Sequence, residues 1–176
     1  MDQSTAHSLA ERGKLEYAEG NFLEAADLFL QSAQNYDSIQ DQLNAAEMKN
    51  NQSVALLQAG NAKGALQATE GTEAIFEQAG DLKRQGIAIS NRGAAFEGLK
   101  RWGEALQEYD RAAAIFESLG EGDMHSTVRN AAAAIHLRRG RLGDSQMDVL
   151  DGLRLVEKPS FSQRMLKFFM KIGLIR

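Results

Sequence analysis

Few residues in this chain have the types and spacing that catalysis or metal binding requires. The 176-residue sequence has no cysteine, and its three histidines are His7, His125 and His136. The last two are 11 residues apart, about 16 Å along a helix at 1.5 Å per residue, which is too far for one metal ion. No serine, histidine and acid set has the spacing of a triad, and the glycines of segment 120–122 follow a helix, which is the wrong context for a phosphate loop. We therefore predict a non-enzymatic protein without a metal or cofactor.

Two asparagines are the more informative polar residues. Asn51 and Asn91 are 40 residues apart, and an amide both donates and accepts hydrogen bonds, which suits it to hold a peptide backbone. Asn130 lies one residue away from the same register. Asparagine is a mediocre helix former, so its recurrence is consistent with a binding role, and amides that only hydrate a helix face would produce the same pattern. The choice between a binding role and simple hydration depends on the secondary-structure elements that carry these asparagines.

A repeat of 40 residues organises those elements. The segment 65–80, ALQATEGTEAIFEQAG, returns without a gap at 105–120 as ALQEYDRAAAIFESLG. Self-similarity at a fixed period in this range is typical of stacked repeats, in which each unit buries a face against its neighbour. With one proline in the whole chain, and many residues that favour helices, we predict an all-α protein.

Glycine, asparagine and aspartate divide the chain into helix pairs. Gly80 followed by Asp81 is a sound helix stop and restart, and Asn21 with Glu24 has the spacing of a capping box. Short turns of this kind make successive helices antiparallel. The predicted pairs are 4–19 with 22–38, 42–59 with 62–79, 82–99 with 102–119, and 124–139 with 142–157.

The residues that recur in these pairs follow a known pattern. In the first and third pairs they are Gly13, Gly20, Phe22, Ala25 and Phe29, and Gly93, Phe96, Trp102, Ala105, Tyr109 and Ala112. By these residues the chain resembles the tetratricopeptide repeat (TPR) family, in a form with a period of 40 residues instead of the usual ~34. The second and fourth pairs match less well. The resemblance implies a right-handed α-α superhelix, or solenoid, of four helix pairs plus a C-terminal capping or interaction helix.

The predicted domains follow from this pattern. The solenoid covers residues 1–157, and a basic amphipathic helix covers 158–176. The repeats of the solenoid lie at about 4–40, 41–80, 81–122 and 123–157.

In the TPR family the first helices of the pairs line a concave groove that binds an extended peptide or a helix. The resemblance implies that the groove of this chain includes Lys14, Tyr17, Asn50, Asn51, Gln58, Asn91, Asn130 and Arg138. Some members clamp a carboxylate with lysines at positions that Ala10 and Ile87 occupy here, so we do not expect that mode. We predict a non-catalytic scaffold or adaptor that binds a protein or peptide whose identity the sequence leaves open.

The C-terminal segment is the second informative stretch. Residues 158–176 hold five bases and no acid, whereas residues 1–40 hold seven acids and two bases. A helix is predicted to start at Ser160, with Gln163 as its capping-box partner. Its interaction face would consist of Phe161, Met165, Lys167, Phe168, Phe169, Lys171 and Ile172.

Three interpretations of this segment stay open. The helix can cap the last repeat, bind a partner or its own groove, or lie on an anionic membrane. The alternative function is therefore a structural or self-assembling subunit docked through this helix, in solution or at a membrane surface, and a homo-oligomer stays open.

Composition bears on nucleic-acid binding, secretion and the cellular compartment of the protein. The isoelectric point near 5.4 and the net charge of −4 disfavour binding to nucleic acid. The N-terminus lacks the basic start and apolar run of a signal peptide, and the absence of cysteine fits a reducing compartment. We therefore expect a cytoplasmic protein.

Overall fold

The computed structural model describes residues 3–157, 159–160 and 163–165, and these are helical apart from short turns and residues 155–157 and 159–160. The chain divides into two compact units, Met1–Arg101 and Trp102–Arg176, and each is described by itself. The helices of the first unit are α1 (Gln3–Ala18), α2 (Phe22–Ser38), α3 (Gln42–Gln58), α4 (Ala62–Ala68), α5 (Thr72–Gln78) and α6 (Leu82–Gly98). Those of the second are α7 (Trp102–Ser118), α8 (Gly122–Arg138) and α9 (Leu142–Arg154).

Left-handed residues at equal spacing end the helices. A positive φ angle occurs every twenty residues, at Gly20, Gln40, Gly60, Gly80, Lys100, Gly120 and Gly140. The next helix begins two residues later in each case. The side chains of the intervening residues Asp41, Asn61 and Asp81 accept a hydrogen bond from the backbone N–H three residues later. The predicted stop and restart at Gly80 and Asp81 is confirmed. The same left-handed backbone conformation thus recurs at each of these turns, and side-chain caps reinforce the helix start at three of them.

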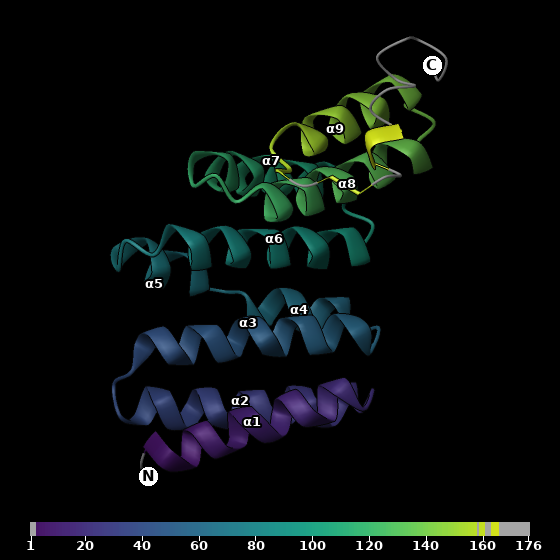
Figure 1. The fold of residues 1–176 in the computed structure, drawn as a ribbon. Coiled ribbons are helices and arrows are strands. Elements are labelled where there is room, and N and C mark those ends of the chain that lie inside the picture. Colours follow the sequence, from purple (N-terminus) through teal and green to yellow (C-terminus); the bar gives the residue numbers. More distant parts are fainter. Residues whose placement is uncertain (1–2, 158, 161–162, 166–176) are drawn as a thin grey trace. The chain divides into compact units, whose positions relative to one another are not determined.

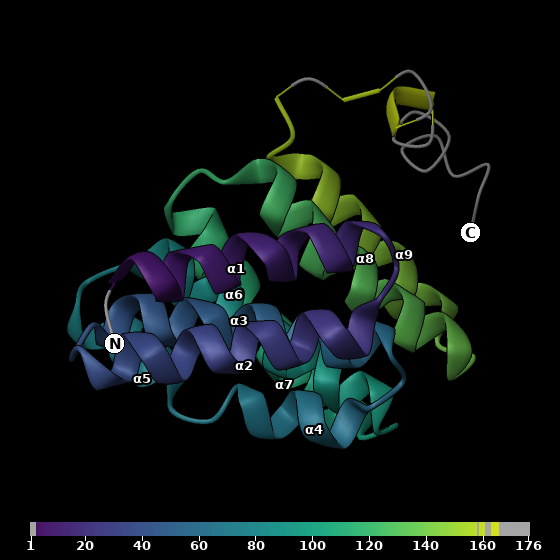
Figure 2. The same cartoon turned by 90° about the horizontal axis from the view of Figure 1, so that it is seen from below.

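The first unit is layered. Helix α2 packs on α1 and α3, and α6 packs on α3, α4 and α5. Figure 1 shows these layers edge-on, and Figure 2 shows α1, α3 and α6 toward one side of the unit with α2 and α4 toward the other. The first helices of the pairs therefore share a side, which is the arrangement that a groove along them requires. The all-α prediction is confirmed for the described residues.

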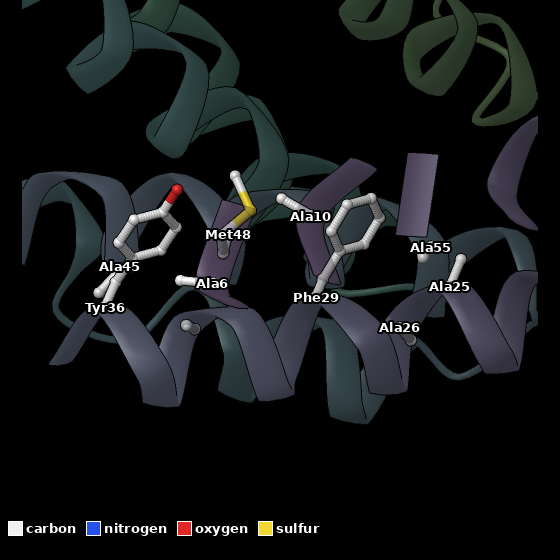
Figure 3. Packing of buried hydrophobic residues seen from close by; sticks show 10 residues of the cluster. Ala6, Ala10, Ala25, Ala26, Phe29, Tyr36, Ala45, Met48 and Ala55 are labelled. Carbon is white, nitrogen blue, oxygen red and sulfur yellow. The ribbon is translucent and has the colours of Figure 1, made fainter. Parts of the chain in front are cut away.

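Small side chains hold the first layers together. Alanines from α1, α2 and α3 surround the rings of Phe29 and Tyr36 and the side chain of Met48 in one buried cluster (Figure 3). A Cβ atom at Gly13 would lie 2.9 Å from the Phe29 ring, so only glycine lets α1 approach that ring so closely. The Ser32 hydroxyl, fully buried, donates to the Ala6 carbonyl at 2.7 Å and joins α2 to α1.

The predicted helix 62–79 is wrong in one respect, because the structure divides it into α4 and α5. Gly71 adopts a left-handed φ of 77°, and the hydroxyls of Thr69 and Thr72 donate to the carbonyls of Leu66 and Thr69 at 2.8 and 2.9 Å. These bonds compete with the helical ladder. The equivalent stretch of the third pair has Arg111 in place of Gly71 and forms one continuous helix.

Two other details also differ from prediction. Asn21 makes no side-chain cap bond, because its amide donates instead to Glu16 at 2.7 Å. Helix α9 ends at Arg154 and not at Glu157. The predicted capping box at Ser160 is confirmed, since the Ser160 N–H donates to Gln163 Oε1 at 2.7 Å and the Gln163 N–H donates to Ser160 Oγ at 3.2 Å.

The helices were also compared with the length and apolar character of a membrane-spanning segment. Within the part of the chain that the structure describes, no helix combines the length and the apolar character needed to cross a bilayer.

Candidate functional site

A small pocket lies on the first-helix side of the first unit. It has a volume of about 210 Å³ and is lined by side chains of three helices: Lys14 and Tyr17 from α1, Phe29 from α2, and Asn51 and Val54 from α3. Three of these, Lys14, Tyr17 and Asn51, are residues that the sequence placed in the groove. The spacing of three on α1 and the spacing of three on α3 each put two lining residues on one helix face.

The pocket has an apolar floor and a polar rim. Phe29 is 3% exposed and Tyr17 and Val54 are half-buried. The Tyr17 ring meets Phe22 edge to face with the centroids 5.3 Å apart, which fixes its orientation. The Lys14 ammonium stands at the rim, 2.7 Å from Glu11 Oε1 in an exposed ion pair that holds the pKa of Glu11 below its usual value. An apolar group can enter while a polar group meets Lys14 or Asn51.

Asn51 and Asn91 occupy equivalent places on α3 and α6, and both are half-buried. Neither amide has a hydrogen-bond partner within the described chain, so both retain their donor and acceptor for a ligand. Asn50, predicted in the same groove, is instead 4% exposed, and its Oδ1 lacks a partner among the described residues. The neighbours Asn50 and Asn51 point in directions about 100° apart on the helix, and only Asn51 reaches the pocket.

The other predicted groove residues are more scattered. Gln58 is exposed near the end of α3. Asn130 and Arg138 lie exposed on α8 in the second unit, where the Asn130 amide is 3.5 Å from Ser126 Oγ. Of the C-terminal interaction face, only Met165 falls among the described residues, and it is half-buried. The remaining members, Phe161, Lys167, Phe168, Phe169, Lys171 and Ile172, lie outside them.

Sequence reasoning missed a polar network between α8 and α9. The Arg129 guanidinium lies 2.6 Å from Asp110 Oδ1 of α7 and 2.7 Å from Asp151 Oδ2 of α9, the latter at an angle that leaves its Nε without a linear hydrogen bond. His125 Nε2 is 3.6 Å from the same Asp151 oxygen, and His136 Nε2 is 3.6 Å from Asp148 Oδ2. The sequence analysis did not predict the carboxylate neighbours of either histidine.

Burial governs the electrostatics of this network. His125 is fully buried, and neither ring nitrogen has a hydrogen-bond partner among the described residues. Burial lowers the pKa of His125, and Arg129 lowers it further against the attraction of Asp151. Burial also raises the pKa of Asp148, which His136 and Arg129 oppose. No group of three or more histidine, aspartate or glutamate side chains placed to hold a metal ion occurs in the described ranges.

Comparison with known proteins adds no family to this picture. No protein-family model matches the chain, and no curated protein matches it.

Proposed function

We propose that the protein is a non-catalytic scaffold of TPR-like helix pairs, stacked as a right-handed solenoid, that binds a protein partner along its first helices. The observation that carries the proposal is the pocket itself, because three predicted groove residues from two helices meet there. The burial pattern supports the stacking, since α3 and α6 repeat it almost position by position. The absence of cysteine supports a reducing, cytoplasmic setting.

The size of the pocket favours a peptide over a metabolite. Pockets for small molecules usually measure ~300–1,000 Å³, whereas this one measures about 210 Å³. It has room for one apolar side chain. Asn51 at the pocket and Asn91 on the next first helix, whose side-chain amides have no partner among the described residues, would then hold the peptide backbone that leads away from that anchor.

A displayed library of random peptides tests the proposal without a known partner. We expect selection on the full chain to enrich peptides with one aromatic or branched aliphatic anchor. The dissociation constant of the best peptide is then measured by fluorescence anisotropy for the wild type and for two variants. Val54→Trp, which fills the pocket, should weaken binding more than ~10-fold, and the double change Asn51→Ala with Asn91→Ala should weaken it roughly 5- to 10-fold, as the loss of two hydrogen bonds implies.

The control is Gln34→Ala, an exposed site on the other side of the first unit's α2. It should bind as the wild type does, and circular dichroism should show the same helix content for all variants. A selected peptide that binds Val54→Trp with unchanged affinity would show that the pocket is not the binding site.

A further inference from the structure

Tyr36 of α2 carries a hydroxyl that the packing of the helix pairs does not require. The same position holds Phe76 in the second pair and Phe116 in the third, and all three rings are buried, with exposures of 6% or less. A tyrosine hydroxyl on a buried ring usually has a hydrogen-bond partner. Within the described ranges the Tyr36 hydroxyl has none, and it is not one of the enclosed polar atoms. It is therefore accessible to a group from outside the chain.

The Tyr36 hydroxyl lies on the same side of α2 as the floor of the pocket. Figure 3 shows the ring of Phe29 and the hydroxyl end of Tyr36 extending in the same direction from α2. The two residues are seven apart in the sequence, which is about 10 Å along a helix. On α3 the same distance from Asn51 leads past Glu47 to Asn44, on one helix face.

Carboxylates of α1 and α3 act on this hydroxyl from both sides. Burial raises the pKa of Tyr36, and the charges of Asp41 and Glu47 raise it further. From α1, Glu11 also raises the pKa of Tyr36 and Lys14 lowers it. The exposed pair of Lys14 with Glu11 is of a kind that contributes little energy and exchanges readily. The first unit as a whole carries 14 acidic and nine basic residues, so its field attracts a basic partner.

The second pair shows which group such a place can hold. There the guanidinium carbon of Arg84 lies 5.2 Å from the centroid of the Phe76 ring. Its Nε donates to Asp81, the N-cap of α6, at 2.6 Å, and its Nη1 donates to Glu47 at 3.1 Å. One aromatic ring and two carboxylates thus hold a guanidinium, whose flat face and forked donors suit both kinds of contact.

Forty residues earlier the same frame has no arginine of its own. The ring is Tyr36, the N-cap is Asp41, and Asn44 stands in the register of Arg84. The cap bonds are the same, because Asn44 donates to Asp41 from its backbone N–H at 3.2 Å and from its side-chain amide at 2.7 Å. The asparagine side chain is shorter than that of arginine, and its Oδ1 has no donor among the described residues.

We propose that the groove holds an arginine of the partner peptide in a subsite next to the pocket, formed by Tyr36, Asn44, Glu47 and Glu11. This inference rests on the proposed function, since it assigns a second contact to the same peptide. The guanidinium lies beside the Tyr36 ring as Arg84 lies beside Phe76, and donates to the hydroxyl and the two carboxylates. Three residues of an extended peptide span about 10 Å, so the arginine lies within about three residues of the apolar anchor.

A matched pair of peptides tests the subsite. We expect the displayed library to enrich arginine within three residues of the anchor. The best such peptide is compared with its citrulline version, which keeps the shape of arginine without the charge. In the wild type the citrulline peptide should bind roughly 10-fold more weakly, as the loss of charged hydrogen bonds implies. Tyr36→Phe, which copies Phe76, should reduce this difference about two- to threefold.

Filling the subsite from within the chain provides a sharper variant. Asn44→Arg places in the first pair the guanidinium that Arg84 supplies in the second, so the arginine and citrulline peptides should bind this variant with equal affinity. The control Gln42→Arg adds the same charge at an exposed position two residues away, on another side of the helix, and should keep the 10-fold difference. Loss of the difference in both variants would mean that only net charge matters, which would overturn the subsite.

The failures of the subsite and of the pocket are distinguishable. Equal affinities of the two peptides for the wild type, together with weakened binding to Val54→Trp, would keep the pocket and overturn the arginine subsite. Unchanged binding to Val54→Trp would reject the pocket and the subsite together.

The melting temperature of the chain alone gives a readout that needs no peptide. If the place accepts a guanidinium, Asn44→Arg should melt about 2–4 °C above Gln42→Arg. A melting temperature at or below that of the control would show that Tyr36 and the carboxylates do not hold a guanidinium, and would overturn the proposal whatever peptides the library yields.

Discussion

The two units use the same helix repeat with different interface chemistry. In the first, α1, α2 and α3 meet through alanines, glycine and two aromatic rings. In the second, α8 and α9 meet through Arg129, two histidines and two carboxylates. At one register position the buried residues are Ala45, Gln85 and His125. The difference shows that the turns and small residues fix the repeat, while the chemistry of each interface is free to change.

The largest effect is expected from the apolar interface. Phe29→Ala removes a buried ring at the centre of the first cluster and should lower the free energy of unfolding by about 3–5 kcal/mol. Chemical unfolding followed by circular dichroism measures the loss. It should be the same at pH 7.5 and pH 5.5, because the variant removes no ionisable group. A loss that depends on pH would contradict the contrast between the two interfaces.

The charged interface should respond to loss of its central cation. Arg129→Met leaves Asp148 and Asp151 without their shared partner, and a broken buried ion pair costs about 3–5 kcal/mol. Because the Arg129 side chain is 18% exposed, water relieves part of this penalty, and we expect about 2 kcal/mol. As a control, Arg111→Met removes a surface pair with Glu108 whose arginine is 48% exposed. It should cost less than about 1 kcal/mol, and equal losses would mean that Arg129 acts only as a surface charge.

The stabilities of the two interfaces should differ in their dependence on pH. The lowered pKa of His125 means that the unfolded chain binds a proton more readily than the folded chain. The second unit should therefore keep its full stability above pH 6.5, the ordinary value for histidine, and lose stability as the pH falls below it. His125→Gln, which copies Gln85 of the third pair, should flatten this slope. Melting temperatures between pH 7.5 and 5.5 provide the measurement, with the exposed His7→Gln as the control; a slope that persists in His125→Gln would contradict the assignment.

The smallest expected effect concerns the backbone. Gly71→Ala places a side chain at a φ of 77° and should destabilise the chain by about 1–2 kcal/mol. Gly103 is the second residue of α7 and has open space around its Cβ position. Gly103→Ala should therefore stabilise the chain by about 0.5–1 kcal/mol. Thermal unfolding of both variants checks the opposite signs. Stabilisation by Gly71→Ala would mean that α4 and α5 can fuse into one helix like α7.

The helix pairs could be predicted because their ends depend on local chemistry. A glycine followed by a capping residue acts within one turn, so Gly80 and Asp81 could be read from the sequence. Gly71 carried a similar signal, but the repeat to Arg111 favoured a continuous helix. Asn21 failed as a cap because its amide has a competing partner, Glu16, five residues back.

The pocket could be predicted only in part. The resemblance to the TPR family, mapped onto the first helices, predicted Lys14, Tyr17 and Asn51 in one groove, and the structure brings these three residues together. Phe29, the floor, lies on a second helix that the groove pattern does not include. The network around Arg129 depends on how α8 and α9 rotate against each other, and no local pattern sets that rotation.

The evenly spaced left-handed residues have a consequence for how such a chain can grow. Each of these residues ends a helix in the same left-handed backbone conformation. If the chain were cut after one of them and rejoined after another, the turn at the junction would therefore be of the same kind. Duplication or deletion of a 40-residue block, such as residues 41–80, would keep every turn intact and preserve the phase of all later helices. A gene coding for this chain can therefore lengthen or shorten the array of helices in whole pairs, with a turn of the existing kind at every junction.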